Sequence, residues 1–171
     1  MALALEEMGF TRYGQQGIKP LFKSRPTELV DVRTMEPPED KKSFMPARYS
    51  MITGDPRLSP NNDFEVKGLT SDDNLDGSKI KVVLISKAGS EGIDFKFIRQ
   101  IHILEPWYNM NRIEQIIGRG VRSLSHALLP FEKSHTINVN SIAPTTVQIF
   151  QYIEKSQILI GIERPTFQKA E

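Results

Sequence analysis

Two arginines, Arg119 and Arg122, have the residue type and spacing best suited to chemistry in this sequence. They close the run Gln115-Ile116-Ile117-Gly118-Arg119-Gly120-Val121-Arg122, which ends an amphipathic helical pattern. Residues three apart project from one helical face, about a turn apart. Each guanidinium is permanently charged and has a planar fork of donors that suits phosphate. The pair therefore indicates a protein that senses a nucleotide phosphate. Surface arginines favoured by the helix dipole are the alternative.

A glycine-rich loop, residues 87–95, follows a strongly apolar stretch and is the second candidate for phosphate contact. Gly89 and Gly92 let backbone N–H groups approach a phosphate, and Ser90 can donate a hydrogen bond to one. Asp94 can accept from a ribose hydroxyl or organise the arginines. Loops at the carboxyl ends of strands line the ligand crevice of open α/β folds. A plain strand-to-helix turn is the alternative, because a short glycine-rich loop is a weak signal.

The elements that must position these residues follow an alternating order. Apolar, β-branched stretches predict strands at 48–53, 80–86 and 98–104, and a further strand at 136–142. Helical patterns cover 1–8, ending at Gly9, a short stretch near 63–69, and 110–119 with the stripe Met110, Ile113, Ile116 and Ile117. A final helix is predicted at 146–155. Strands that alternate with helices predict an α/β fold around a parallel sheet, with 80–86 as a buried parallel strand.

The domain organisation is predicted from composition along the chain. Five prolines among many charges in residues 11–47 predict a long connection or insertion. The first helical stretch has no capping residue and no preceding strand, so we expect it to lie in the middle of a larger unit. Residues 1–133 are expected to form one lobe, and 134–171 its end or a diverged extension.

Overall composition is that of a soluble globular protein. The chain has 171 residues, 39% of them hydrophobic and 25% charged, and no cysteine. The lack of cysteine excludes disulfides, a thiol nucleophile and a zinc–thiolate site. No apolar run approaches the roughly 18 residues that span a bilayer, so no membrane partner is expected. The net charge of +1 is uneven: −3 over residues 1–78, +4 over 79–133 and zero over 134–171. The modest positive charge around the arginines suits a polyanionic partner, and also an ordinary solvated surface.

The order of these features resembles a known family. The segment from Lys81 to Arg122 resembles the C-terminal RecA-like domain of superfamily 2 helicases. Within it, the sequences of residues 103–109 and 112–115 are similar to those of helicase-like NTPases of large nucleocytoplasmic DNA viruses. Residues 86–94 look like motif V of that domain, and residues 115–122 like motif VI. Thr53-Gly54-Asp55 is similar to the short strand-end motif that touches nucleic-acid backbone. The implied fold is a RecA-like parallel sheet flanked by helices.

The resemblance implies a role for each matching residue. On the nucleotide side, Arg122 would be the arginine finger on the γ-phosphate of ATP, Arg119 a second phosphate or interlobe contact, and Gln115 and Gly118 further nucleotide contacts. An arginine finger neutralises the charge that builds up on the transferring phosphoryl group. Gly92 and Asp94 would connect the nucleotide state to the grip on nucleic acid. Thr53, Ser90 and Gly89 would contact the strand backbone of DNA or RNA.

Two departures from the family pattern limit what this chain can do alone. It has no Gly-x-x-x-x-Gly-Lys-Ser/Thr loop and no Asp-Glu dipeptide, so the phosphate cradle and the magnesium-holding acid are absent. We therefore expect an N-terminal RecA-like lobe, in the same or another chain, to hold ATP and magnesium. The alternatives are a non-catalytic nucleic-acid-binding module, or an NTP-binding subunit used for transcription or assembly.

The remaining candidates have ordinary interpretations. Trp107 can stack on a base, but more often such a residue packs beneath the following helix. His102 alternates with apolar neighbours in a predicted strand and reads as structural. Asp72, Asp73 and Asp76 lack the distal glutamate of a calcium loop and predict a solvated turn.

Overall fold

A computed structural model describes residues 1–14, 20–24, 27–40, 42–86, 92–104, 110–121, 128, 137–138, 142–143 and 148–151. Its main sheet has three parallel strands in the order β1 (Thr11–Arg12), β2 (Arg48–Ile52) and β3 (Val82–Ile85). Tyr49 pairs with Val82, and Ile52 with Ile85. The parallel sheet with helices confirms the predicted α/β class.

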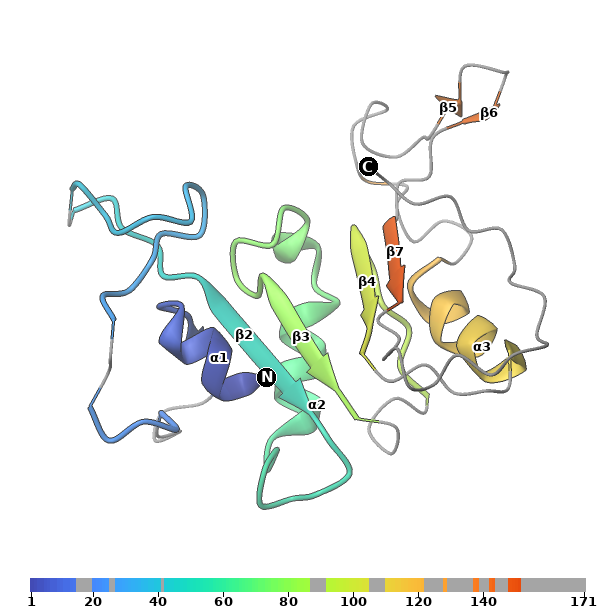
Figure 1. Cartoon of the computed structure of the whole chain (residues 1–171), viewed down its shortest axis with the longest axis horizontal. Helices are drawn as coiled ribbons and strands as arrows, with labels where there is room; N and C mark the ends of the chain where they lie inside the picture. Colours follow the sequence, from blue (N-terminus) through green and yellow to red (C-terminus); the bar gives the residue numbers. More distant parts are fainter. Residues whose placement is uncertain are drawn as a thin grey trace, which may run out of the picture.

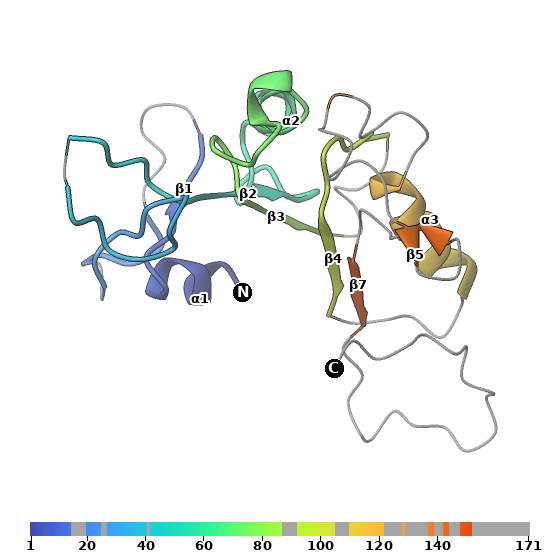
Figure 2. The same ribbon diagram turned by 90° about the horizontal axis from the view of Figure 1, so that it is seen from above.

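The two faces of β2 are covered by different helices, because alternate side chains of a strand point to opposite faces. Tyr49 and Met51 belong to a core that packs against Leu5 of α1 (Ala2–Glu7). Ile52 belongs to a second core with Leu69 of α2 (Asn62–Leu69). Figure 2 shows α1 and α2 on opposite sides of the sheet. This α/β/α layering places the start of α2 beside the carboxyl end of β2.

Buried ionisable groups hold both helices to the sheet. The fully buried Glu65 of α2 accepts hydrogen bonds from Ser50 Oγ at 2.6 Å and from the Met51 N–H at 2.9 Å. Its other oxygen lies 3.5 Å from the Arg12 guanidinium. On the opposite face, Glu6 accepts from the Tyr49 hydroxyl at 2.8 Å. Burial and this contact with Glu6 raise the pKa of Tyr49 well above its usual range. These buried contacts of Glu65 and Glu6 therefore hold α2 and α1 in place against β1 and β2.

A second part of the fold carries the arginine helix. β4 (Gln100–Ile103) pairs in parallel with β7 (Gln148–Gln151), and α3 (Met110–Gly120) lies beside them (Figure 1). A short 3-10 turn, η1 (Asp72–Asn74), precedes β3. Two further two-residue strands, β5 (Ile137–Asn138) and β6 (Ile142–Ala143), pair with each other in antiparallel fashion. No helix within the described ranges is long and apolar enough to cross a membrane.

Several predicted elements are confirmed, and others are corrected. The helices at the start, near 63–69 and at 110–119 are present, as are the three predicted strands 48–53, 80–86 and 98–104. The helix predicted at 146–155 is wrong over 148–151, which form β7; the rest of it lies outside the described residues. Its isoleucine and phenylalanine suit a strand, and pairing with β4 decides the outcome. Within the strand predicted at 136–142, residues 137–138 form β5 and residue 142 begins β6, while 136 and 139–141 lie outside the described residues.

Two expectations about burial also change. β3 was predicted to be buried, but among the described strands it lies at the edge of its sheet, and Ile85 is 38% exposed. In α3, Ile113 is buried, whereas Met110 and Ile116 of the predicted stripe are exposed. Among the described residues, α3 lies beside the two paired strands β4 and β7, and Ile113 and Gly120 are its buried positions.

The segment expected as a connection, 11–47, also contributes to the sheet and its core. β1 lies within it, and Val30 and Val32 are buried against the core on the α1 side. Gly9 precedes it with φ +90°, and a Cβ there would clash with the Glu28 carbonyl oxygen. This close approach requires glycine at the turn out of α1.

Candidate functional site

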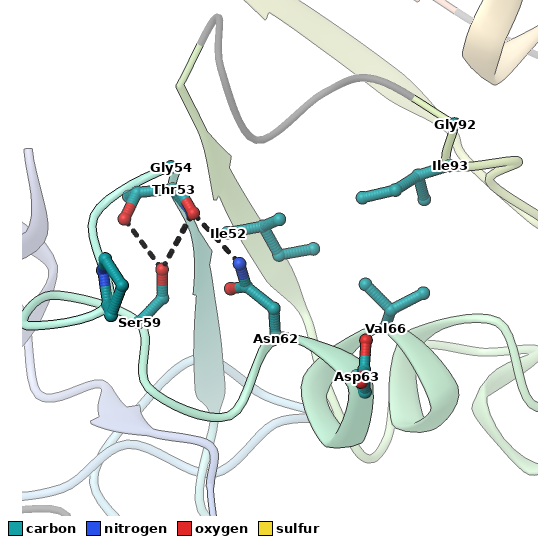
Figure 3. A pocket seen from close by; sticks show the side chains of 10 residues that line it. Ile52, Thr53, Gly54, Ser59, Asn62, Asp63, Val66, Gly92 and Ile93 are labelled. Atoms are coloured by element: carbon teal, nitrogen blue, oxygen red, sulfur yellow. Dashed lines mark hydrogen bonds between the residues drawn. The ribbon is translucent and has the colours of Figure 1, made fainter.

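A pocket of about 460 Å³ lies where the carboxyl ends of β2 and β3 meet the start of α2 (Figure 3). Its lining comes from the end of β2, the following loop, the first turns of α2 and the segment after β3. The lining residues are Ile52, Thr53, Gly54, Pro56, Ser59, Asn62, Asp63, Val66, Gly92 and Ile93. Thr53 and Gly92, predicted from two separate motifs, are thus brought to one pocket. This is the position at which open α/β sheets bind ligands.

A compact hydrogen-bond network shapes the β2 side of the pocket. The buried Ser59 hydroxyl accepts from the Thr53 N–H at 2.9 Å and lies 2.7 Å from the Thr53 hydroxyl. The Asn62 side-chain amide donates to the Thr53 carbonyl at 2.9 Å. Arg12 of β1 donates to the Leu58 carbonyl in the same loop. The loop after β2 is therefore held from both ends, and Thr53 has a fixed position (Figure 3).

An ion pair closes the outer turn of this loop. Arg57 donates to Asp55 through its Nε at 3.1 Å and its Nη2 at 2.9 Å, and its backbone N–H donates at 2.9 Å. These hydrogen bonds lower the pKa of Asp55 below its ordinary value. Asp55 is therefore ionised at neutral pH and stabilises the turn rather than acting as an acid.

Gly92 and Ile93 form the opposite wall of the pocket. Gly92 is exposed with φ +75°, and a Cβ at this position would meet no atom of the described residues within 4 Å. The space beside its backbone is open to an approaching group, whereas its conformation favours glycine. Asp94, two residues further on, is exposed.

Arg119 is connected to this wall through the backbone. Its guanidinium donates to the Ile93 carbonyl at 3.4 Å, and its own carbonyl accepts from the Phe95 N–H at 3.4 Å. The C-terminal turn of α3 thus contacts the segment that lines the pocket. Arg119 is half-buried, and its side chain contacts the segment that also lines the pocket.

The other predicted nucleotide contacts differ in their surroundings. Gln115 and Gly118 are exposed, and within the described part of the chain a Cβ at Gly118 would meet nothing closer than 4 Å. Gly120 is buried, and a Cβ there would lie 2.9 Å from Ile101 Cδ1 and 3.3 Å from Ile98 Cγ2. Gly120 is therefore the point where α3 packs on β4, while Gly118 faces open space.

Three predicted site residues, Arg122, Ser90 and Gly89, lie outside the described residues. Trp107 lies outside them as well. Their roles stay predictions from the sequence. Among the residues that the structure does describe, no group of three His, Asp or Glu side chains is arranged to hold a metal ion.

The sequence reasoning missed Ser59, Asn62 and Asp63. They lie within the polar stretch Leu58-Ser59-Pro60-Asn61-Asn62-Asp63, which leads into α2 at Asn62. Small polar residues before a helix are a sequence signal for its N-terminus. That signal places the helix start, but only the fold shows that it lies beside Thr53.

Comparison with known proteins shows which family part of this chain is similar to. Residues 65–123 match the family described as the helicase conserved C-terminal domain. This stretch contains the second half of α2 and all of β3, the Gly92 segment, β4 and α3, so the predicted resemblance to that helicase domain is confirmed. No solved structure matches this chain.

The similar relatives are viral. Nucleoside triphosphatase I of Melanoplus sanguinipes entomopoxvirus is 42% identical over 108 residues, which cover 58% of this chain and 16% of that protein. A putative ATP-dependent RNA helicase, R350, of Acanthamoeba polyphaga mimivirus is 42% identical over 78 residues, covering 45% and 10%. A termination factor NPH-I homolog of African swine fever virus is 40% identical over 106 residues, covering 62% and 13%. The chain therefore spans less than a fifth of the length of each of these relatives.

Proposed function

We propose that this chain forms the C-terminal RecA-like lobe of an ATP-dependent nucleic-acid helicase or translocase. It would supply the arginine finger and part of the nucleic-acid contact surface. The supporting observation is the connection between two motifs: Thr53 and Gly92 line one pocket, and Arg119 is hydrogen-bonded to the Ile93 carbonyl in the same wall. A nucleic-acid strand bound at the pocket and a nucleotide bound at α3 would therefore both affect the segment that contains Gly92 and Ile93.

In this proposal each part has a separate task. Thr53, Ser90 and Gly89 contact the strand backbone, and Gly92 and Asp94 couple that contact to the nucleotide. Arg119, Gln115 and Gly118 face ATP, and Arg122 neutralises the γ-phosphate as it is transferred. Magnesium and the phosphate cradle come from an N-terminal RecA-like lobe, in the same or another chain.

The names of the relatives support this class and favour a second candidate. One is a nucleoside triphosphatase, one a putative ATP-dependent RNA helicase and one a termination factor homolog. A role as the NTPase part of a viral transcription complex is therefore the second candidate. This second candidate has the same lobe and the same arginines as the first, and differs in the process that ATP hydrolysis drives.

An ATPase assay tests the proposal. The chain, mixed with an N-terminal RecA-like lobe that carries a phosphate loop and an acidic box, should hydrolyse ATP faster in the presence of single-stranded nucleic acid. Neither part alone should do so. Nucleic-acid binding by this chain without any gain in ATP hydrolysis from the mixture would support the non-catalytic binding module instead.

A further inference from the structure

β3 has the sequence of an internal strand but the surroundings of an edge strand. Its four residues, Val82–Ile85, are all apolar, which is typical of a parallel strand that is covered on both faces. β2, which has a strand on each side, is buried at four of its five positions, whereas no residue of β3 is fully buried. Among the described strands, only β2 pairs with β3. The other edge of β3 therefore offers backbone N–H and C=O groups to a further strand.

β4 lies on this side of β3 but does not pair with it. In both views of the ribbon, β4 lies beyond β3 as seen from β2, and β7 lies beyond β4 (Figure 1, Figure 2). Ile98, which precedes β4, packs against the same buried core as Val83 of β3. Within the described part of the chain, β4 pairs with β7 alone. One edge of β3 and one edge of β4 thus lie on the two sides of a single position.

The helices α1 and α2 determine on which side of β1 a further strand can be connected. β2 is followed by α2 and then by its neighbour β3, so this crossover passes over the α2 face of the sheet. α1 lies on the opposite face and leads into β1. Crossovers between parallel strands of one sheet are right-handed in about 98% of cases. Because the two helices cover opposite faces, a right-handed crossover through α1 starts from a strand on the β3 side of β1.

The place of α1 agrees with that position. β2 and β3 already occupy the first two places beside β1, which leaves the outer edge of β3. Ala2 and Leu5 of α1 pack against the same core as Val82 and Leu84 of β3, so α1 lies under both strands. In Figure 1, α1 begins near the carboxyl end of β2 and runs back towards its start. A crossover helix begins where the strand before it ends, so such a strand would run parallel to β2 and β3.

We propose that an apolar strand, supplied by residues on the amino side of Met1 and leading into α1, pairs in parallel with β3 in the position between β3 and β4. In the relatives, most of the chain lies outside the stretch that matches. The added strand joins the two described parallel sheets into one. This inference goes beyond the proposed function, since it concerns how the lobe is completed and not the reaction. By joining the sheets, the strand fixes the segments that carry Gly92 and Arg119 relative to each other.

Hydrogen exchange of backbone amides, followed by mass spectrometry, tests this position. The 171-residue chain is compared with the same chain extended at its amino end by the residues encoded directly upstream, about 12 of them, enough for one strand and a short turn. The amides of β3 should exchange about tenfold or more slowly in the extended chain, because an edge without a partner opens at little cost in free energy. The amides of β2 are the internal reference and should exchange equally in the two proteins.

A second extended chain, with proline at the central residue of the added strand, is the matched control. Proline has no N–H to donate and is excluded from strands inside a sheet, so the amides of β3 should again exchange as in the 171-residue chain. The 171 residues are the same in all three proteins, so the control does not disturb their own packing.

Three results would overturn the proposed position of the strand. The first is equal exchange of the β3 amides with and without the extension, and the second is protection that survives the proline. The third is protection of β3 as strong as that of β2 in the chain without an extension, because residues of this chain would then already pair with the edge. These outcomes do not depend on ATP hydrolysis or nucleic-acid binding, so the proposed function stands or falls by its own assay.

Discussion

At the scale of single residues, Ser59 is the centre of the network that fixes Thr53. Its hydroxyl contacts both the N–H and the hydroxyl of Thr53, and its side chain is buried. Thr53 itself does not depend on a charge for its position. A substitution at Ser59 therefore affects the position of Thr53 through the loss of hydrogen bonds, without a change in charge.

Replacing Ser59 by alanine should leave the Thr53 N–H without its acceptor. We expect a loss of about 1–3 kcal/mol in the free energy of unfolding, the cost of a buried polar group without its partner. Affinity for single-stranded nucleic acid should also fall, because the loop that carries Thr53 loosens. Urea unfolding and anisotropy measure the two effects. Ser43→Ala, at an exposed position, is the control; equal effects of the two substitutions would contradict the account.

Asp31 gives a prediction about pH. Its carboxylate accepts from Arg33 Nε at 3.0 Å and Nη2 at 2.9 Å, and from the Met45 N–H at 3.1 Å. These hydrogen bonds, led by those from Arg33, hold the pKa of Asp31 well below its usual range. The carboxylate therefore stabilises the fold above its unfolded pKa of about 4, and this contribution is lost as the pH falls below that value.

The corresponding variant, Asp31→Asn, should be less stable at neutral pH and should lose less stability than the wild type between about pH 5 and pH 2. Urea unfolding at several pH values measures the difference. Glu39→Gln should show the same acid dependence as the wild type. An Asp31→Asn curve parallel to the wild-type curve would show that the hydrogen bonds of Asp31 do not contribute to acid sensitivity.

At the scale of elements, α2 is held to the sheet by a buried charge and α3 by a small residue. Glu65 connects α2 to β2 and to Arg12, whereas Gly120 lets α3 approach β4. The first contact is polar and fully buried, and the second is steric. They predict different responses to substitution.

Glu65→Ala should be strongly destabilising. It removes the acceptor of Ser50 and of the Met51 N–H and leaves the Arg12 guanidinium buried without its carboxylate. Breaking one side of a buried pair typically costs about 3–5 kcal/mol. The free energy of unfolding in urea measures this, with the exposed Glu39→Ala as the control. A loss below about 1 kcal/mol would mean that the pair is not a main link between α2 and the sheet.

Gly118 and Gly120 form a matched pair on α3. Gly118→Ala should raise the free energy of unfolding by about 0.5–1 kcal/mol, because alanine favours a helix and the space is open. Gly120→Ala should gain less or be destabilising, because its Cβ would meet Ile101 and force that side chain to move. Thermal unfolding of the two variants gives the comparison. Equal gains would show that α3 does not pack closely on β4 at Gly120.

These elements also show what the sequence can and cannot predict. The strand 80–86 and the helix 110–119 were predictable, because local apolar periodicity is strong in both. β1 was missed because two residues carry no periodic signal, and β7 was taken for helix because its pairing with β4 is a long-range contact. The pocket residue Thr53 was found through a motif. Ser59 and Asn62 could not be predicted in this way, because they reach Thr53 only when the loop after β2 is folded.

At the scale of the whole molecule, the central claim is that this chain provides an arginine finger to a nucleotide held elsewhere. The positive charge concentrated in residues 79–133, the contact between Arg119 and the pocket wall, and the similarity to a helicase C-terminal domain all support it. The phosphate loop is absent from the chain, so the claim requires two lobes.

The most direct test is the effect of Arg122→Ala on ATP hydrolysis by the chain combined with an N-terminal RecA-like lobe, stimulated by single-stranded nucleic acid. The account predicts that the rate falls by about 10³-fold or more, the scale of an arginine finger. Affinity of the chain for nucleic acid should change by less than about twofold, because Arg122 acts on the nucleotide. An unchanged rate of ATP hydrolysis in the Arg122→Ala variant would contradict the account.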